Sequence, residues 1–146
     1  MIHNLTKKNI ISRSPFYATG FILRARGMIG RSFASADFDA MVFDRCGSIH
    51  TLFMSEAIDV VFIDSDNKVC GVRPELAPWR PGVVVRGARS VIELPAGAIA
   101  LLNIEVGDIV DLNAEVLPEM VRKMPDGAKI APAPTKPVMP CKESLK

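Results

Sequence analysis

Two polar side chains interrupt apolar segments and could carry acid–base chemistry. His50 lies in residues 48–54, a strand-like segment with polar side chains on both of its faces. Asp59 lies in residues 58–63, which are otherwise apolar. An imidazole can act as a general base when a carboxylate within hydrogen-bond reach orients it. One hypothesis is therefore a hydrolase-type enzyme in which His50 and Asp59 form the acid–base pair.

Both side chains also have a purely structural interpretation. His50 could be a histidine held in place by its own hydrogen bonds. A carboxylate in an apolar strand must be paired or hydrogen-bonded, so Asp59 could form a buried ion pair or could orient a ligand. The natural partners for Asp59 are four arginines: Arg24, Arg26, Arg31 and Arg80.

The single tryptophan of the chain indicates a possible binding surface. Trp79 and Arg80 lie side by side in residues 74–82, which contain three prolines and must form an irregular loop. Aromatic rings stack on ligands, and an arginine can bind an anion with two parallel hydrogen bonds. The alternative is that Trp79 covers one end of the fold with Arg80 stacked on its ring.

These residues favour a small binding module over an enzyme. The module would bind an anionic small molecule or a peptide carboxylate. We expect its binding residues to be His50, Asp59, Trp79 and Arg80, together with Arg26 and Arg31.

The sequence predicts no metal and no cofactor. Cys46 and His50 are four residues apart, but no second Cys/His pair completes a zinc site. The acidic turn at residues 64–68 begins like a calcium loop, but it lacks the glycine and the closing glutamate of such loops. No P-loop, dinucleotide-binding glycine motif or nucleophile elbow is present.

Composition limits the class of protein. The chain has 146 residues, a net charge of +2 and 49% hydrophobic residues, which suits one globular domain. Residues 1–112 contain 12 basic and 12 acidic side chains, so we expect no nucleic-acid partner. No apolar run is long enough to span a bilayer, and three cysteines are best explained as reduced thiols. We therefore expect a cytoplasmic protein without a membrane span.

Apolar patterning predicts a mainly β fold with one or two short helices. The first helix is expected at residues 16–26, after Ser14-Pro15, and the second at residues 96–102. Gly107-Asp108 suits a tight turn before the last strand. The expected strands are residues 40–43, 48–54, 58–63, 69–73, 83–85, 90–94 and 109–112.

The end of the chain differs in composition from the rest. Residues 117–146 are rich in proline and lysine, so we expect an irregular, polyproline-like tail after a single domain formed by residues 1–116. The tail could bind a protein partner, in which case the chain would be an accessory protein of a larger assembly.

Three ordered motifs resemble the domain-of-unknown-function family 192. Residues 24–31 (RARGMIGR) resemble its Arg-x-x-Gly-Leu-Met-Gly-Arg element. Residues 48–62 (SIHTLFMSEAIDVVF) align without gaps with its second element, and residues 93–97 (ELPAG) with 102–108 resemble its closing element. Residues 49–54 place the chain with a branch that carries Ile-His-Thr-x-Phe-Met in place of the Trp-Met-Lys-Asn-Thr of other members. The resemblance implies a prokaryotic protein with a small barrel-like, cradle-loop-like β fold and brings no assigned activity.

Overall fold

The computed structural model describes residues 1–19 and 26–113. Its one helix with defined bounds is α2 (Ala98–Leu102). The strands are β1 (Ile2–Asn4), β2 (Asn9–Ser12), β3 (Pro15–Tyr17), β4 (Ala40–Phe43), β5 (Ser48–Ile49), β6 (Ile58–Ile63), β7 (Val69–Leu76), β8 (Val83–Val84), β9 (Ser90–Pro95) and β10 (Val110–Asp111).

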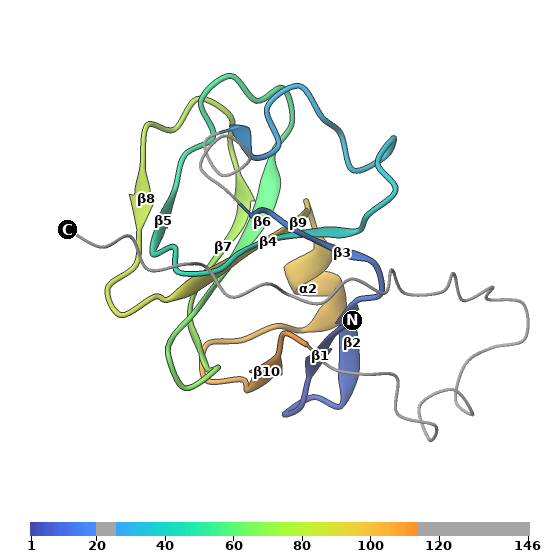
Figure 1. The fold of residues 1–146 in the computed structure, drawn as a ribbon, viewed down its shortest axis with the longest axis vertical. Helices are drawn as coiled ribbons and strands as arrows, with labels where there is room; N and C mark the ends of the chain where they lie inside the picture. The colour runs from blue at the N-terminus through green and yellow to red at the C-terminus, as the bar shows by residue number, and fades with distance from the viewer. Residues whose placement is uncertain (20–25, 114–146) are drawn as a thin grey trace, which may run out of the picture.

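The strands form three sheets. The central sheet has the order β3-β4-β9-β6-β7, and all of its pairs are antiparallel except β3 with β4. A second sheet has the order β10-β1-β2, and β5 pairs with β8 in a short ribbon. Figure 1 shows the ribbon at one side of the central sheet and the β10-β1-β2 sheet at its lower end, with α2 between. The mainly β fold is confirmed, but the sheets do not close into the expected barrel.

Both faces of the central sheet are buried, because its middle strands are apolar on both sides. Successive side chains of a strand point to opposite faces. In β6, Val61 and Ile63 belong to one buried cluster, whereas Val60 and Phe62 belong to another. We call these clusters the helix-side core and the ribbon-side core, because the first contains Ile99 of α2 and the second contains Ile49 of β5.

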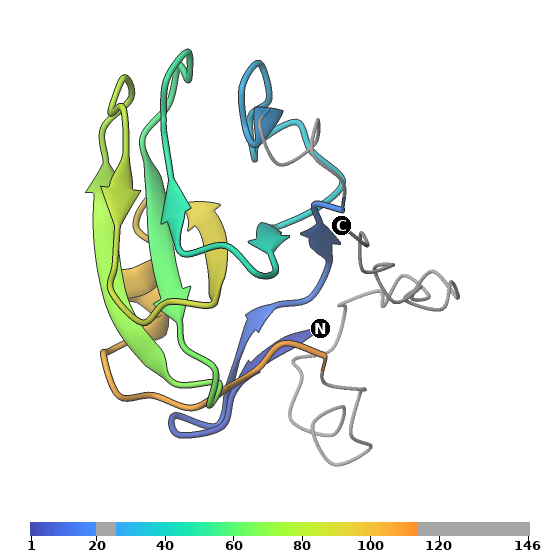
Figure 2. The same ribbon diagram turned by 60° about the vertical axis from the view of Figure 1, so that its left-hand side comes forward.

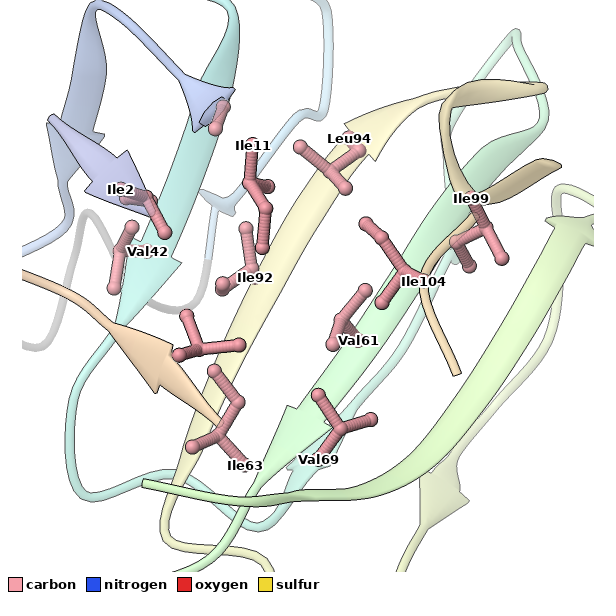
Figure 3. Close-up of a cluster of buried hydrophobic side chains, with 12 residues drawn as sticks. Ile2, Ile11, Val42, Val61, Ile63, Val69, Ile92, Leu94, Ile99 and Ile104 are labelled. Carbon is pink, nitrogen blue, oxygen red and sulfur yellow. The ribbon is translucent and has the colours of Figure 1, made fainter. Parts of the chain in front are cut away.

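The helix-side core joins the central sheet to α2 and to the β10-β1-β2 sheet. Figure 3 shows Ile92 and Leu94 of β9 facing Ile2 of β1 and the residues Ile99 and Ile104. Figure 2 shows the strands of the central sheet side by side, with the β1–β2 hairpin at one end of them. Burial of these aliphatic side chains is the main source of stability.

Two expected elements differ in the structure. The helix expected from Ser14-Pro15 is wrong at its start, because Pro15–Tyr17 forms β3 and pairs with β4. A proline can begin an edge strand because the missing N–H is not needed there. Residues 20–25, within the same expected helix, lie outside the described part of the chain. The expected strand 48–54 is only Ser48–Ile49, after which the backbone turns and reaches φ 62° at Phe53.

The Pro- and Lys-rich tail, residues 117–146, lies outside the described residues, and the proposed domain end at residue 116 lies there too. Within the described residues, no helix has the length and apolar character needed to cross a membrane.

Candidate functional site

Asp59 is a structural acid that connects three elements. It is fully buried in β6. Its Oδ1 accepts a hydrogen bond from the Glu75 amide in β7 at 2.7 Å, and its Oδ2 accepts one from the Ile99 amide in α2 at 2.7 Å. Among the described candidates, Arg26, Arg31 and Arg80 make no ion pair with Asp59, whose partners are these backbone amides, and Arg24 lies outside the described residues. The carboxylate satisfies a donor in the first turn of the helix, where negative charge is also favourable.

The structure contradicts the expected pairing of Asp59 with His50. Asp59 lies between Ile58 and Val60 of the ribbon-side core, so its side chain points to the opposite, helix-side face. His50 follows Ile49, a member of the ribbon-side core, and it lines a pocket on that side. Both residues are described, and no hydrogen bond joins them, because the carboxylate binds the two amides instead. An acid–base pair of these two side chains is excluded.

Trp79 and Arg80 lie in an exposed loop that Thr51 organises. The buried hydroxyl of Thr51 donates to the Ala77 carbonyl and accepts from the Arg80 amide, and the Trp79 amide donates to the Thr51 carbonyl. Trp79 is 61% exposed, and its ring makes an edge contact with Phe53, with the centroids 5.1 Å apart. The aromatic partner of Trp79 is therefore Phe53, and the pair presents its rings to solvent.

Arg31 stacks on an aromatic ring. Its guanidinium lies over the ring of Phe16 in β3, 5.6 Å from the centroid. The side chain is only partly exposed, and it does not line the pocket that contains His50.

Two of the predicted binding residues, Arg26 and His50, meet in one small pocket on the ribbon side of the central sheet. The pocket has about 50 Å³ of space for water-sized molecules, enough for a few waters or for a small polar group. Asp59, Trp79, Arg80 and Arg31 do not line this pocket. Its lining residues are Arg26, Gly27, Phe43, Cys46, Ser48, Ile49, His50 and Glu93.

Glu93 of β9 is the residue that most clearly marks the pocket as a site. It is only 2% exposed, and its Oε2 has no hydrogen-bond partner among the residues that the structure describes. Burial raises the pKa of its carboxyl group from 4.5 to about 8, so the side chain is neutral at pH 7. His50 contributes a second unsatisfied atom, because its buried Nδ1 also lacks a partner. Native proteins seldom leave buried polar atoms unsatisfied, so these two mark the pocket as the candidate site.

The remaining polar groups of the pocket surround these two atoms. Arg26 is exposed, and its Nε donates to the Ile29 carbonyl at 3.4 Å. The Cys46 thiol donates to the Ser48 carbonyl at 2.9 Å, so it is already occupied. No group of three or more His, Cys, Asp or Glu side chains in the described part of the chain is arranged to hold a metal ion.

Sequence reasoning missed Glu93, although a signal was present. Asp59 was singled out as the acid inside an apolar strand, but Glu93 has the same context, since it lies between Ile92 and Leu94. The two acids differ in their hydrogen-bond partners. Asp59 meets two amides from distant segments, whereas Glu93 has an oxygen that none of the described polar groups reaches. Only the tertiary structure separates these cases.

Comparison with known proteins identifies a family. The DUF192 family model, described as "Uncharacterized ACR", matches residues 12–112, which is more than half of the chain. The match begins in β2 and ends just after β10, so it contains every residue that lines the pocket.

Curated relatives come from species of Pyrococcus and Thermococcus. A UPF0127 protein of Pyrococcus furiosus is 36% identical over 112 residues, which cover 75% of this chain and 96% of that protein. A UPF0127 protein of Pyrococcus abyssi is 40% identical over 96 residues, which cover 64% of this chain and 81% of that protein. A UPF0127 protein of Thermococcus sibiricus is 44% identical, but the match spans only 44% of its length and 47% of this chain.

Solved structures share the fold at low sequence identity. A protein of unknown function from Novosphingobium aromaticivorans has a TM-score of 0.58 and 22% identity, covering 66% of this chain and 73% of that chain. A protein from Sinorhizobium meliloti, which its description proposes to be a transcription regulator, has a TM-score of 0.59 and 23% identity, covering 66% and 79%. These similarities support the fold alone.

Proposed function

The chain belongs to the DUF192 (UPF0127) family of uncharacterised proteins, and we propose that this member is a small binding protein whose pocket receives the anionic end of a small molecule or peptide. The observation that carries the proposal is the pair of buried, unpartnered polar atoms, Glu93 Oε2 and His50 Nδ1, in a pocket that also contains Arg26.

The pocket has the donors that an anionic group requires. Arg26 carries a permanent positive charge at the solvent side of the site, and its terminal N–H groups are donors in addition to the Nε that binds the Ile29 carbonyl. The neutral carboxyl group of Glu93 can donate its proton in a hydrogen bond, and the ring of His50 supplies a further nitrogen. A bound anion would satisfy buried groups that the protein itself leaves without partners.

A panel of anions at neutral pH tests the proposal. We expect formate, acetate, phosphate or a short peptide to shift the amide signals of Gly27, Ser48 and His50 in two-dimensional NMR spectra. Arg26→Gln should abolish the shifts, because it removes the positive charge of the pocket. Arg73→Gln is the matched control, since Arg73 is exposed on β7 and does not line the pocket. The proposal fails if no anion shifts these signals, or if the two variants behave alike.

A second candidate is proton-transfer catalysis by the same pocket. The observation that favours it is that His50 and Glu93 line the same pocket and each has an unsatisfied atom. The pair of His50 and Asp59 lacks this arrangement, because Asp59 lies outside the pocket and binds backbone amides. A carboxyl group with a pKa near the working pH suits a general acid. Glu93→Gln separates the candidates, because an amide can still hydrogen-bond a ligand but cannot exchange a proton. Binding would survive this change, whereas turnover of an ester or amide substrate would be lost.

A further inference from the structure

The position of Glu93 in the central sheet suggests which anion the pocket prefers. In the register of the sheet, Glu93 lies beside Met41 of β4 and Val60 of β6, both of which belong to the ribbon-side core. The carboxyl group thus replaces an apolar side chain in the middle of an apolar face. Its neutral state follows from this burial, for which no positively charged group among the described residues compensates.

The charged and titratable groups that line the pocket with Glu93 are few. Within the described part of the chain they are Arg26, Cys46 and His50, while β4 contributes Phe43 and β6 faces Glu93 with Val60. Among the lining residues that the structure describes, Arg26 is the single permanent cation. An ion with two negative charges would therefore leave one charge without a partner, which is costly in a poorly solvated pocket.

The backbone at Gly27 shapes the space above the carboxyl group. A side chain at this position would place its Cβ 3.9 Å from both Glu93 oxygens and 3.7 Å from Phe43 Cζ. Gly27 also has φ 49°, a conformation that favours glycine. The chain therefore passes close to the carboxyl group, and only a small volume is left in the pocket.

We propose that the pocket binds a monocarboxylate, whose ionised oxygen accepts a hydrogen bond from the protonated carboxyl group of Glu93 while Arg26 neutralises the shared charge. This inference rests on the proposed function and names its ligand class. One proton then lies between two carboxyl groups, because two adjacent carboxylates in a buried site cannot both be ionised. No covalent bond forms or breaks.

Proton sharing makes binding depend on pH in a specific way. Once Glu93 loses its proton, its negative charge repels the ligand and no hydrogen-bond donor remains. Affinity should be constant while Glu93 is protonated. It should fall about tenfold for each pH unit once the group has ionised.

Titration with acetate, propionate and phosphate between pH 6 and 9.5 tests the inference. In the wild type, the two carboxylates should bind and phosphate should bind at least tenfold more weakly. The affinity for acetate should fall at alkaline pH. Glu93→Gln should retain acetate binding within a few-fold at pH 7 but lose the alkaline decrease. His50→Gln and Cys46→Ser each remove another titratable group of the pocket. Both variants should keep the alkaline decrease in acetate affinity, because Glu93 is still present.

The outcomes are distinguishable. If anions bind but the affinity for acetate is independent of pH, or if phosphate binds as tightly as acetate, the monocarboxylate inference is wrong and the proposed function stands. If no anion binds, both are wrong. Should Glu93→Gln fail to fold, the carboxyl carbon-13 signal of Glu93 in the wild type gives the same information. Acetate must move its titration to higher pH, and an unmoved titration would overturn the inference.

Discussion

At the residue scale, two buried acids on opposite faces of one sheet show how context decides the role of a side chain. Asp59 and Glu93 both interrupt apolar strands, and both are almost inaccessible to solvent. Asp59 is satisfied by two backbone amides and therefore stabilises the fold. Glu93 is left with an unsatisfied oxygen beside a pocket, so it reduces stability and is available for binding.

Glu93 should make the stability of the protein depend on pH. The folded state keeps a proton at Glu93 up to about pH 8, whereas the unfolded chain releases it near pH 4.5. The folded state therefore binds more protons in this window, so the free energy of unfolding falls as pH rises through it. Glu93→Gln cannot ionise, and its stability relative to wild type should increase from pH 5 to pH 8 by at most roughly 4 kcal/mol.

Chemical denaturation at several pH values measures this difference. Glu75→Gln is the control, because Glu75 is exposed on β7 and its charge is solvated in both states. Its stability difference from wild type should not vary between pH 5 and 8. A Glu93→Gln variant that follows the wild-type pH profile would contradict the buried, neutral state of this carboxyl group.

At the element scale, the structure shows which elements can be predicted from local patterns. Strands β4 and β6 match the expected residues, because each is a short apolar run with turn residues on at least one side. The turn after β6 was also expected, and Asp64 accepts hydrogen bonds from the amides of Asp66 and Lys68 there. β3 was not predicted, because its strand conformation depends on pairing with the distant β4.

The site follows the same rule. Arg26 and His50 could be selected from the sequence by residue type, and the structure brings them to one pocket. Their meeting with Glu93 depends on the register of β9 with β4 and β6, which no local pattern specifies.

Asp59 joins elements, so its replacement should weaken the junction of β6, β7 and α2. In Asp59→Asn, one amide hydrogen of the new side chain would face a backbone N–H, leaving a buried donor unsatisfied. We expect a loss of about 2–4 kcal/mol in the free energy of unfolding. Denaturant unfolding with an unchanged slope measures it.

Asp64→Asn is the matched control for this change. Asp64 also accepts from two backbone amides, but it lies in a partly exposed turn where asparagine is well tolerated. Its cost should stay below about 1 kcal/mol. Equal losses in the two variants would show that Asp59 has no special role.

Thr51 should hold the Trp79 loop in place. Thr51→Val keeps the shape of the side chain but removes the hydroxyl that binds Ala77 and Arg80. We expect a loss of about 1–2 kcal/mol and a change in the fluorescence and near-ultraviolet dichroism of Trp79. The tryptophan signals can be assigned to Trp79 directly, because the chain contains one tryptophan.

Thr6→Val is the control variant, because the Thr6 hydroxyl also accepts a hydrogen bond from a backbone amide, in this case the amide of Ile109. It should reduce stability without changing the tryptophan spectrum. If the Thr51→Val spectrum equals that of the wild type, the hydroxyl does not determine the loop conformation.

At the scale of the whole molecule, β1 closes the fold from outside the family match. The match begins at residue 12, but Ile2–Asn4 is the middle strand of the β10-β1-β2 sheet. Ile2 is fully buried in the helix-side core, and the Asn4 side chain donates to Asp108 at 2.7 Å. These contacts join the two ends of the described chain.

Two truncations test whether the N-terminal segment is integral and whether residues after Leu117 are dispensable for folding. Deleting residues 1–8 removes the partner strand of both β2 and β10 and exposes one face of the helix-side core. We expect this variant to lose its cooperative thermal transition, because a buried isoleucine and all β1 hydrogen bonds are lost together. Deleting the residues after Leu117 should leave the transition within a few degrees of the full chain, since both cores are already filled by described residues between Ile2 and Val110. Differential scanning calorimetry measures both variants. A cooperative transition without residues 1–8 would show that β1 is an accessory strand, and loss of the transition without the tail would place part of the folding unit beyond Leu117.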